Sequence, residues 1–311
     1  PMMAKMVDSV FANRHQQIVN QHEEAVCKCS QRNRANGSRV EALAGDRRGE
    51  RPLAFPSLMK GSMTMKPLRV LVVGWTATTG GIEHFLMAYC GKMNRERVQF
   101  DFLCRFSPIA CQKEAEKIGK IYTITRRSSD IMRYYREIND FFREHGHEYD
   151  IIWDNECMFN DMTPLKKAAE VGIPVRIAHC HNPRNMDKSA IGHVQGFLHR
   201  VNHHSLSRYA NVLWACSMES AKWACPAMDL PCEVIPNAID AQMFRFSEQV
   251  RREVREQYGL ENCLVVGHVG RLQYQKNQTF LLDAFRHLHE REEKARLVLV
   301  GDGPGLTEVE A

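Results

Sequence analysis

The pattern of apolar and polar residues changes at Leu68, where short apolar runs begin to alternate with stretches whose apolar residues recur every three or four positions. A short unbroken apolar run is typical of a strand buried on both faces, and the wider spacing is typical of an amphipathic helix. The pattern predicts strands at 68–74, 98–105, 120–126, 149–155, 174–182, 211–217 and 232–240. Helices are predicted over 81–93, over 131–145 and between the later strands. This alternation predicts an α/β fold, with a parallel sheet covered by helices on both faces.

The helix predicted over 131–145 is strongly amphipathic. Its aromatic and aliphatic residues are expected on one side, facing the sheet: Ile131, Tyr134, Tyr135, Ile138, Phe141 and Phe142.

A second, shorter series of elements follows a charged helix or linker around 246–257. Its strand, helix and strand are expected at 263–270, 275–290 and 296–303. Two strands do not make a stable doubly wound sheet. We therefore interpret 67–245 as a complete N-terminal Rossmann-like domain, and 246–311 as a linker with an incomplete C-terminal domain. Missing strands should leave apolar surface exposed around Leu297–Val300.

Residues 1–66 lack sustained periodicity and are polar, so we expect a disordered or spurious extension, with Met63 or Met65 as a sensible true start. They contain 11 Lys and Arg against 6 Asp and Glu, whereas residues 67–311 contain 31 of each. The whole surplus of +5 therefore lies in residues 1–66, and the net charge does not indicate a basic face on residues 67–311. Nucleic acid is not an expected partner.

The 11 cysteines are irregularly spaced in a chain of 311 residues. The sequence has no long apolar segment of a signal peptide and no run of about 18 apolar residues that could span a bilayer. We interpret the cysteines as reduced and mostly buried in a cytoplasmic protein. Cys27 and Cys29 lack the spacing and the second ligand pair of a zinc site.

A glycine pair, Gly80 and Gly81, ends the loop after the first predicted strand and opens the first helix. Glycine allows a close backbone approach, and free N–H groups at a helix start favour an anion. Only Gly74 precedes the pair, so the loop is not the G-x-G-x-x-G dinucleotide motif. A phosphate-binding loop and an ordinary glycine turn both remain open from these residues alone.

Two histidines end a later strand in the segment AHCHN. In open parallel sheets, ligands bind outside the carboxyl ends of the strands. His181 could there hydrogen-bond a sugar hydroxyl or stabilise charge. One of His179 and His181 is expected in the core and the other in the cleft. A zinc site that also recruits His203 and His204 is an alternative, but the familiar ligand spacing is missing.

The segment HVGRLQYQKN places Arg271 on a strand end and Lys276 near the start of the following helix. An arginine offers a fork of donors to phosphate oxygens, and a lysine adds a mobile point charge. The pair suits a diphosphate, although two unrelated charges on a solvated loop would give the same residues.

Six segments in order resemble one family. They are the glycine pair, the H-C-H-N strand end, Cys216-Ser217, I-P-N-x-I-D-x-x-x-F over 235–244, G-R-L-x-x-Q-K-N over 270–277, and V-L-V-G-D-G-P over 298–304. The chain resembles the GT-B glycosyltransferases of family 4, and within it the exopolysaccharide or capsule-type group.

The resemblance implies a retaining transferase that moves a sugar from a nucleotide diphosphate sugar, with no protein-bound metal and no further cofactor. Gly80 and Gly81 would lie beneath the donor phosphates, and His181 would contact the transferred sugar. Arg271 and Lys276 would hold the departing diphosphate. The nucleotide side would be lined by Gly301 and Gly303.

One feature of the family has no counterpart before Ala311, namely two glutamates eight residues apart in the second domain. Glu248/Glu256 and Glu253/Glu261 match the spacing but precede that domain, and we interpret them as a solvated helix face. The chain is therefore expected to be an inactive fragment of the family.

The expected acceptor is a glycan, in particular a lipid-linked one. Peripheral contact with the inner membrane face is expected through Arg126, Arg127, Arg133 and Arg136, with Tyr134 and Tyr135 between them, unless these form a solvated helix face. Two alternatives remain: a non-catalytic module that binds an acceptor or partner, and a different Rossmann enzyme. Cys104-Arg105 at the second strand end disfavours the latter, because dinucleotide enzymes carry an acidic residue there.

Overall fold

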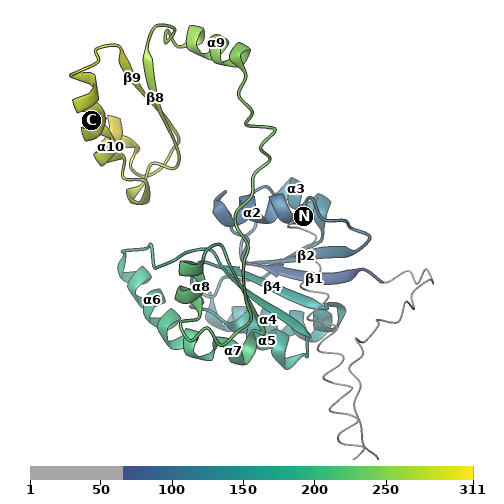
Figure 1. The fold of residues 1–311 in the computed structure, drawn as a ribbon. Helices are drawn as coiled ribbons and strands as arrows, with labels where there is room; N and C mark the ends of the chain where they lie inside the picture. Colours follow the sequence, from purple (N-terminus) through teal and green to yellow (C-terminus); the bar gives the residue numbers. More distant parts are fainter. Residues whose placement is uncertain (1–65, 311) are drawn as a thin grey trace, which may run out of the picture. The chain divides into compact units, whose positions relative to one another are not determined.

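The computed structural model describes residues 66–310. The extension predicted over 1–66 and the pair Cys27 and Cys29 therefore lie outside the described residues, apart from Lys66. The chain divides into two compact units, of which the first ends at Ala238 and the second begins at Ile239 (Figure 1).

The first unit is built on a seven-stranded sheet, and all of its strand pairs are parallel. The strands are β1 (Leu68–Val73), β2 (Val98–Cys104), β3 (Ile121–Thr123), β4 (Ile151–Glu156), β5 (Val175–Cys180), β6 (Val212–Ala215) and β7 (Cys232–Val234). Their order is β3-β2-β1-β4-β5-β6-β7. The direction of winding reverses between β1 and β4, which is where an open sheet of this kind forms a crevice at its carboxyl edge. The predicted α/β class is confirmed.

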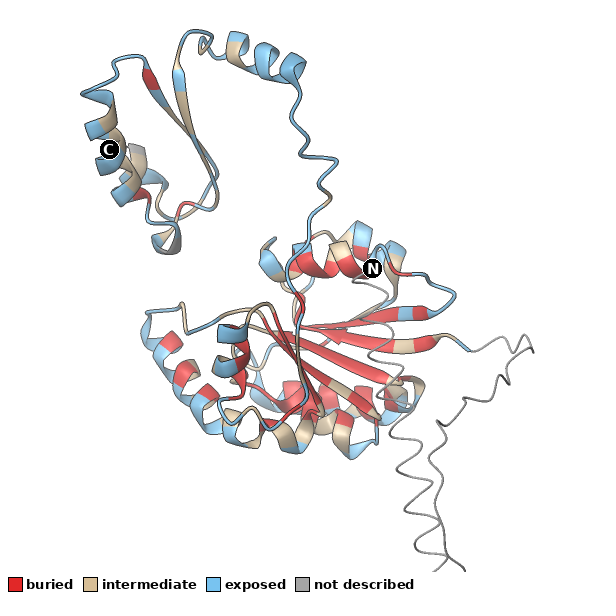
Figure 2. Ribbon diagram, in the orientation of Figure 1, coloured by how far each residue is buried: buried red, intermediate tan, exposed pale blue. Residues whose placement is uncertain are grey.

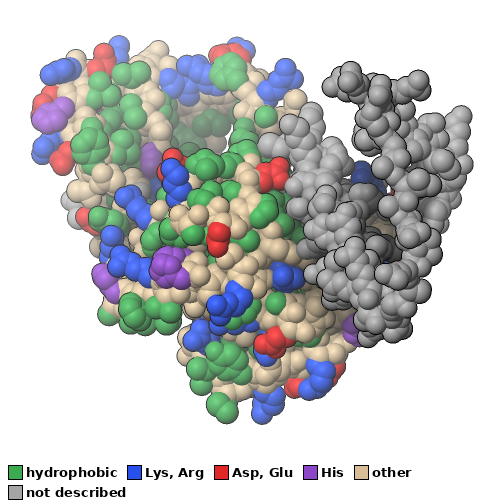
Figure 3. Space-filling view, turned by 60° about the horizontal axis from the view of Figure 1, so that its bottom comes forward, with side chains coloured by type: hydrophobic (Ala, Val, Ile, Leu, Met, Phe, Trp, Pro, Cys, Tyr) green, Lys and Arg blue, Asp and Glu red, His purple; other side chains and the backbone are tan. Residues whose placement is uncertain are grey.

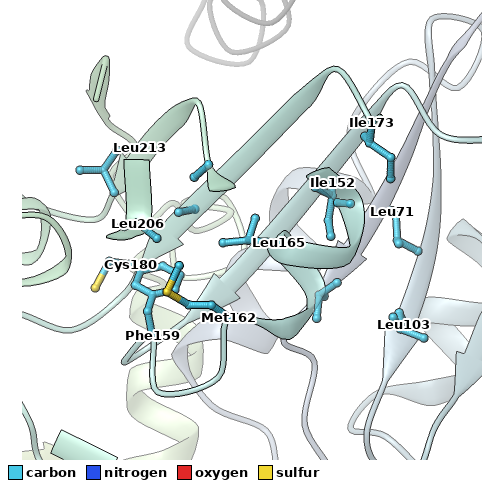
Figure 4. Close-up of a cluster of buried hydrophobic side chains, with 14 of the residues drawn as sticks. Leu71, Leu103, Ile152, Phe159, Met162, Leu165, Ile173, Cys180, Leu206 and Leu213 are labelled. Carbon is cyan, nitrogen blue, oxygen red and sulfur yellow. The ribbon is translucent and has the colours of Figure 1, made fainter. Parts of the chain in front are cut away.

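Helices cover both faces of this sheet, and each face has its own apolar core (Figures 1 and 2). One face carries α2 (Gly81–Cys90) and α3 (Gln112–Ile118). The other carries α4 (Ile131–His145), α5 (Thr163–Glu170), α7 (Leu206–Tyr209) and α8 (Met218–Ala224). Figure 4 shows part of this second core, where side chains from the strands meet those of the helices and loops. The strands are continuous apolar runs because they are buried on both sides.

The amphipathic helix α4 differs from the prediction at two positions. Tyr134, Ile138, Phe141 and Phe142 are buried, but Ile131 and Tyr135 are exposed. Ile131 lies in the first turn and lines an open cavity rather than the core. Tyr135 follows Tyr134 by about 100° around the helix axis, which places it at the edge of the apolar stripe.

The second unit contains α9 (Glu248–Gln257), β8 (Leu264–Val269), α10 (Gln278–His289), β9 (Ala295–Val300) and α11 (Leu306–Glu310). β8 and β9 form a parallel two-stranded sheet. None of α9 is buried, which agrees with the interpretation of Glu248, Glu253 and Glu256 as a solvated face. Val300 is exposed and Leu297 to Leu299 are half-buried, so the apolar surface expected here is present.

The surface of the described residues carries both signs of charge. On the face drawn in Figure 3, basic and acidic side chains are interspersed rather than gathered by sign. Among residues 66–310, no helix is long and apolar enough to cross a membrane.

Candidate functional site

The carboxyl edge of the first sheet gathers polar residues from neighbouring strands. Gly74 follows β1, Arg105 follows β2, and Asn155 and Glu156 end β4. His181 follows β5 and donates its backbone N–H to the carbonyl of Glu156 at 3.0 Å. Because the winding reverses between β1 and β4, this edge is the expected ligand site of the unit.

The glycine pair lies at the start of α2. Gly80 is the N-cap in extended backbone, and Gly81 is the first helical residue. A Cβ placed on Gly81 would meet no atom within 4 Å, so the fold itself does not require glycine there. The buried carboxylate of Glu83 accepts hydrogen bonds from the Thr76 backbone N–H at 3.0 Å and the Thr76 hydroxyl at 2.7 Å. This carboxylate fixes the loop that leads to the glycines.

His181 is held against the same helix. Its ring lies 5.1 Å from the ring of Phe85 in α2, and its Nε2 lies 3.1 Å from Oδ1 of Asn155. The Asn155 amide nitrogen donates to the carbonyls of Trp153 and Val73, so Oδ1 is left as the acceptor. His181 therefore carries its proton on Nε2 and offers Nδ1 as an acceptor. Burial lowers the pKa of His181 to about 4, which keeps the ring neutral at pH 7.

His179 lies in the core and His181 is half-buried at the sheet edge, as predicted. Strand alternation does not separate them, because residues two apart on a strand share a face, and the two rings lie 4.1 Å apart at 30°. His179 is fully buried and its Nδ1 accepts from the Trp153 indole at 3.1 Å. His181 is only half-buried because β5 ends at Cys180.

Burial, with a smaller contribution from His181, places the pKa of His179 well below its usual value. Within the described residues, no group of three or more His, Cys, Asp or Glu side chains is arranged to hold a metal ion.

A cavity of about 540 Å³ opens at the carboxyl ends of β1, β2 and β4. It contains both signs of charge and two aromatic rings. The lining side chains include Trp75, Arg105, Phe106, Arg126, Arg127, Glu156, Asn160, Asp161, Gln195 and Leu198.

The charges in the cavity are paired with one another. Arg105 bonds to Glu156 and also lies 3.6 Å from Asp161, which Arg127 approaches to 3.7 Å. Asp161 additionally accepts from the Tyr134 hydroxyl at 2.7 Å and the Thr163 hydroxyl at 2.6 Å. Burial acts to raise the pKa of Asp161, but these hydrogen bonds and the charge of Arg105 outweigh it and lower the pKa overall.

Two carboxyl groups on β4, those of Asp154 and Glu156, have raised pKa values, in contrast to Asp161. Asp154 has no hydrogen-bond partner for either oxygen, and burial beside Glu156 raises its pKa well above the usual value despite the charge of Arg105. Burial also raises the pKa of Glu156, against the opposing effect of Arg105. The cluster thus holds a buried carboxyl group with a raised pKa behind the Arg105–Glu156 pair.

The basic and aromatic residues predicted to meet lipid do not form one interleaved surface. Tyr134 is fully buried and bonded to Asp161, while Arg127 faces the same carboxylate. Arg126 lies over the ring of Phe106 at 5.3 Å. Arg133 pairs with Glu137 on the exposed face of α4. The alternative of a solvated helix face fits Arg133 but not Tyr134.

In the second unit, the two strand ends lie close together. The Gly270 N–H donates to the Val300 carbonyl and the Leu272 N–H to the Asp302 carbonyl, each at 2.9 Å. A Cβ on Gly301 would lie 1.9 Å from the Gly270 carbonyl oxygen, and one on Gly303 would lie 2.4 Å from that of Leu272. Both glycines also have positive φ, so this approach explains them without any ligand.

The predicted cations belong to the same loop cluster. The stem of Lys276 crosses Gly270, with its Cε 3.5 Å from a Cβ placed there. Arg271 is exposed, and its carbonyl accepts from the buried side chain of Gln278 at 3.1 Å. The structure therefore brings Arg271, Lys276 and Gly301 to the carboxyl edge of the second sheet.

Several residues of these sites are absent from the sequence prediction. They are Glu83, Arg105, Asp154, Asn155, Glu156, Asp161 and Gln278. The run DNE directly after the apolar residues of β4 was a usable signal, because polar residues at a parallel strand end face the ligand edge.

Comparisons with known proteins also show a similarity to glycosyltransferases. Residues 250–311 match the family model described as "Glycosyl transferases group 1". A relative, "Putative glycosyltransferase EpsF" of Bacillus subtilis (strain 168), is 29% identical over 255 residues, which cover 80% of this chain and 65% of the relative.

Solved structures show the same architecture at low identity. HepE of Anabaena, in complex with UDP and glucose, has a TM-score of 0.57 and 22% identity, over 78% of this chain and 64% of HepE. A glycosyltransferase from Rickettsia africae has a TM-score of 0.56 and 13% identity, over 76% and 61%. The fold is thus GT-B-like, and the chain spans less than two thirds of each of these proteins.

Proposed function

We propose that the protein moves a sugar from a nucleotide diphosphate sugar to a glycan, on the premise that residues 250–311 match the group 1 glycosyltransferases. The observation that carries the proposal is the loop cluster of Arg271, Lys276 and Gly301, which lies inside the matched residues at the carboxyl edge of a parallel sheet. A relative named for glycosyl transfer and a fold neighbour that binds UDP and glucose support a donor of this class.

The proposed role of the cations is to stabilise the leaving group. The bond from the anomeric carbon to the diphosphate oxygen breaks, and the acceptor hydroxyl oxygen bonds to the same face of that carbon. The acceptor proton passes to the departing diphosphate. Arg271 and Lys276 would meet the negative charge, so no protein-bound metal is required. One such fixed donor is typically worth about 3–4 kcal/mol in the barrier.

The proposed role of His181 is to bind a hydroxyl of the transferred sugar, with its neutral ring as the hydrogen-bond acceptor. Its pKa of about 4 makes a positive charge at pH 7 unfavourable. Its Nε2–H is engaged by Asn155, so a sugar hydroxyl would donate to Nδ1. His181 was expected either to hydrogen-bond a sugar hydroxyl or to stabilise charge. Its neutral ring supports the first of these roles.

The proposed acceptor site is the cavity at β1, β2 and β4. Paired charges such as Arg105 and Glu156 leave little net charge, yet they keep lone pairs and N–H groups for hydroxyls. Phe106 adds aromatic surface, and the buried Trp75 backs the cavity. We assign the acceptor to the lipid-linked glycans of surface polysaccharide synthesis, with the protein at the cytoplasmic face of a membrane.

The test is to incubate the purified protein with nucleotide sugars and a lipid-linked acceptor, and to determine the new linkage by NMR. Retention of the donor's anomeric configuration supports the proposal. A product with the inverted anomeric configuration would contradict the proposed retaining transfer. Donor binding without transfer would fit an inactive fragment, whereas acceptor binding with no donor affinity would favour a non-catalytic module.

A further inference from the structure

The cavity at the carboxyl ends of β1, β2 and β4 is lined by more basic than acidic side chains. Its charged lining residues are Arg105, Arg126, Arg127, Glu156 and Asp161. Arg105 pairs with Glu156, and Arg127 lies 3.7 Å from Asp161. Arg126 is left over, because no carboxylate of residues 66–310 forms an ion pair with it.

The carboxyl group behind the cavity does not supply the missing negative charge. Asp154 is not among the lining residues, and burial beside Glu156 raises its pKa well above the usual value despite the charge of Arg105. Burial also raises the pKa of Glu156. Both effects disfavour further negative charge, so the lining groups keep a surplus of one arginine over the carboxylates.

Arg126 is held in place by its neighbours. Its backbone carbonyl accepts from the Ser129 N–H at 2.9 Å, and the adjacent Thr125 donates its N–H to the Glu137 carboxylate at 2.6 Å. The guanidinium carbon of Arg126 lies 5.3 Å from the centroid of the Phe106 ring, which also lines the cavity. A guanidinium over an aromatic face keeps the N–H groups on its edge for a planar anion.

Other lining groups suit the hydroxyls of a sugar. Asn160 and Gln195 line the same cavity and offer amide donors and acceptors. Arg127 is attracted by Asp161 at 3.7 Å, but this distance is too long for a hydrogen bond, so its N–H groups can still bind a ligand. A matching ligand therefore carries several hydroxyls and one negative charge.

We propose that the acceptor presents a sugar acid to this cavity, with its carboxylate bound by Arg126 and its hydroxyls by Asn160 and Gln195. One carboxylate balances the surplus of one arginine, whereas a phosphate monoester carries a charge of about −1.5 to −2 at pH 7. The inference deepens the proposed transfer to a glycan and rests on it. In this account Arg126 determines which acceptor binds and takes no part in the departure of the diphosphate.

The test compares methyl glucuronide with methyl glucoside, which carries a hydroxymethyl group in place of the carboxylate. Each sugar is titrated into the full chain, and its dissociation constant is measured by saturation-transfer NMR at low and at high salt. The glucuronide is expected to bind about tenfold more tightly, because only its carboxylate can form a charge-assisted hydrogen bond. This preference should shrink at high salt, since Arg126 is exposed.

Three variants locate the preference. Arg126→Gln should reduce it to about threefold or less, because the amide has no charge. Arg126→Lys keeps the charge but lacks the planar fork, and should retain part of it. Arg136→Gln is the matched control and should keep the full preference, because Arg136 is an exposed cation of α4 that is not among the lining residues.

Equal binding of the two sugars by the wild type, or an undiminished preference in Arg126→Gln, would overturn the proposal. So would tighter binding of glucose 6-phosphate than of the glucuronide, because the site would then be one for phosphate, such as that of a lipid carrier. The melting temperature of Arg126→Gln should match that of the wild type, since the side chain is exposed. Titration with nucleoside diphosphates tests the proposed function separately, because Arg126 lies in the first unit and Lys276 in the second.

Discussion

Nε2 of His181 lies 3.1 Å from Oδ1 of Asn155, and the two carbonyls bonded to the Asn155 amide nitrogen determine which atom faces the imidazole. The relationship assigns the proton of His181 to Nε2 and leaves Nδ1 for a ligand. It also joins the ends of β4 and β5, two neighbouring strands of the sheet.

The first prediction concerns the charge of His181. Nitrogen-15 NMR should find its ring neutral, with the proton on Nε2, at pH 6, because burial lowers its pKa to about 4. His181→Ala should reduce turnover about tenfold or more while leaving acceptor binding nearly unchanged. A protonated ring at pH 6, or full turnover in His181→Ala, would contradict the assigned role.

The second prediction contrasts two glycines. Gly301→Ala should destabilise the second unit by about 1–3 kcal/mol, since its Cβ would overlap the Gly270 carbonyl. Gly81→Ala should leave unfolding unchanged within about 1 kcal/mol, because its Cβ has open space. Donor affinity should nevertheless fall in Gly81→Ala if phosphate approaches this backbone. Calorimetric melting and donor titration of both variants provide the readouts, and unaltered donor affinity in Gly81→Ala would remove that glycine from the site.

The third prediction concerns stability against pH. The folded-state pKa values of His181 and His199 are lowered to about 4 by burial. As the pH falls from about 6.5 to about 4, the unfolded chain takes up protons that the folded chain does not, so stability falls. Each histidine contributes up to about 1.4 kcal/mol per pH unit in this window.

Asp154 and Glu156 act in the opposite direction, because their raised pKa values favour the folded state at lower pH. Comparing the protein with His199→Gln isolates one histidine. Urea unfolding at pH 7 and pH 5 should show a smaller loss of stability on acidification in His199→Gln than in the wild type. His193→Gln, at an exposed position of the same helix, is the control. An identical pH dependence in all three proteins would contradict a neutral buried His199.

The fourth prediction concerns the cavity. Arg105→Gln should destabilise the first unit by about 3 kcal/mol, because Glu156 and Asp161 would lose the cation that compensates their charge. Arg133→Gln, which removes an exposed ion pair with Glu137, should change stability little. Equal effects of the two substitutions in urea unfolding would show that the Arg105 pair is solvated.

The sequence predicted secondary structure correctly where one physical rule determines the pattern of residues. Continuous apolar runs identified the strands because burial on both faces leaves no alternation to misread. His179 and His181 were expected in different surroundings and are, but they share one strand face, and it is the end of β5 at Cys180 that leaves His181 half-buried. Tyr135 shows the limit of helical spacing, since the edge of a stripe depends on neighbours that only the fold supplies.

The candidate site was predictable only in part, for a physical reason. Arg271 and Lys276 could be predicted from one segment because they lie five residues apart. Arg105 and Asp161 are far apart in the sequence and meet through the parallel order of β2, β1 and β4. Helix α6 (Ala190–Asn202) shows a further limit. Its exposed Ile191, Val194, Phe197 and Val201 have the spacing of an ordinary core face, and only the burial of Gly192 and Gly196 reveals which side is packed.

The central claim is that a diphosphate binds at Lys276, and calorimetric titration tests it most directly. The protein, Lys276→Ala and the control Lys294→Ala would each be titrated with UDP, GDP and ADP. The account predicts that a nucleoside diphosphate binds the wild type and Lys294→Ala alike, and binds Lys276→Ala about tenfold more weakly or worse. Equal affinity in all three proteins, or no nucleoside diphosphate binding to the wild type, would contradict it.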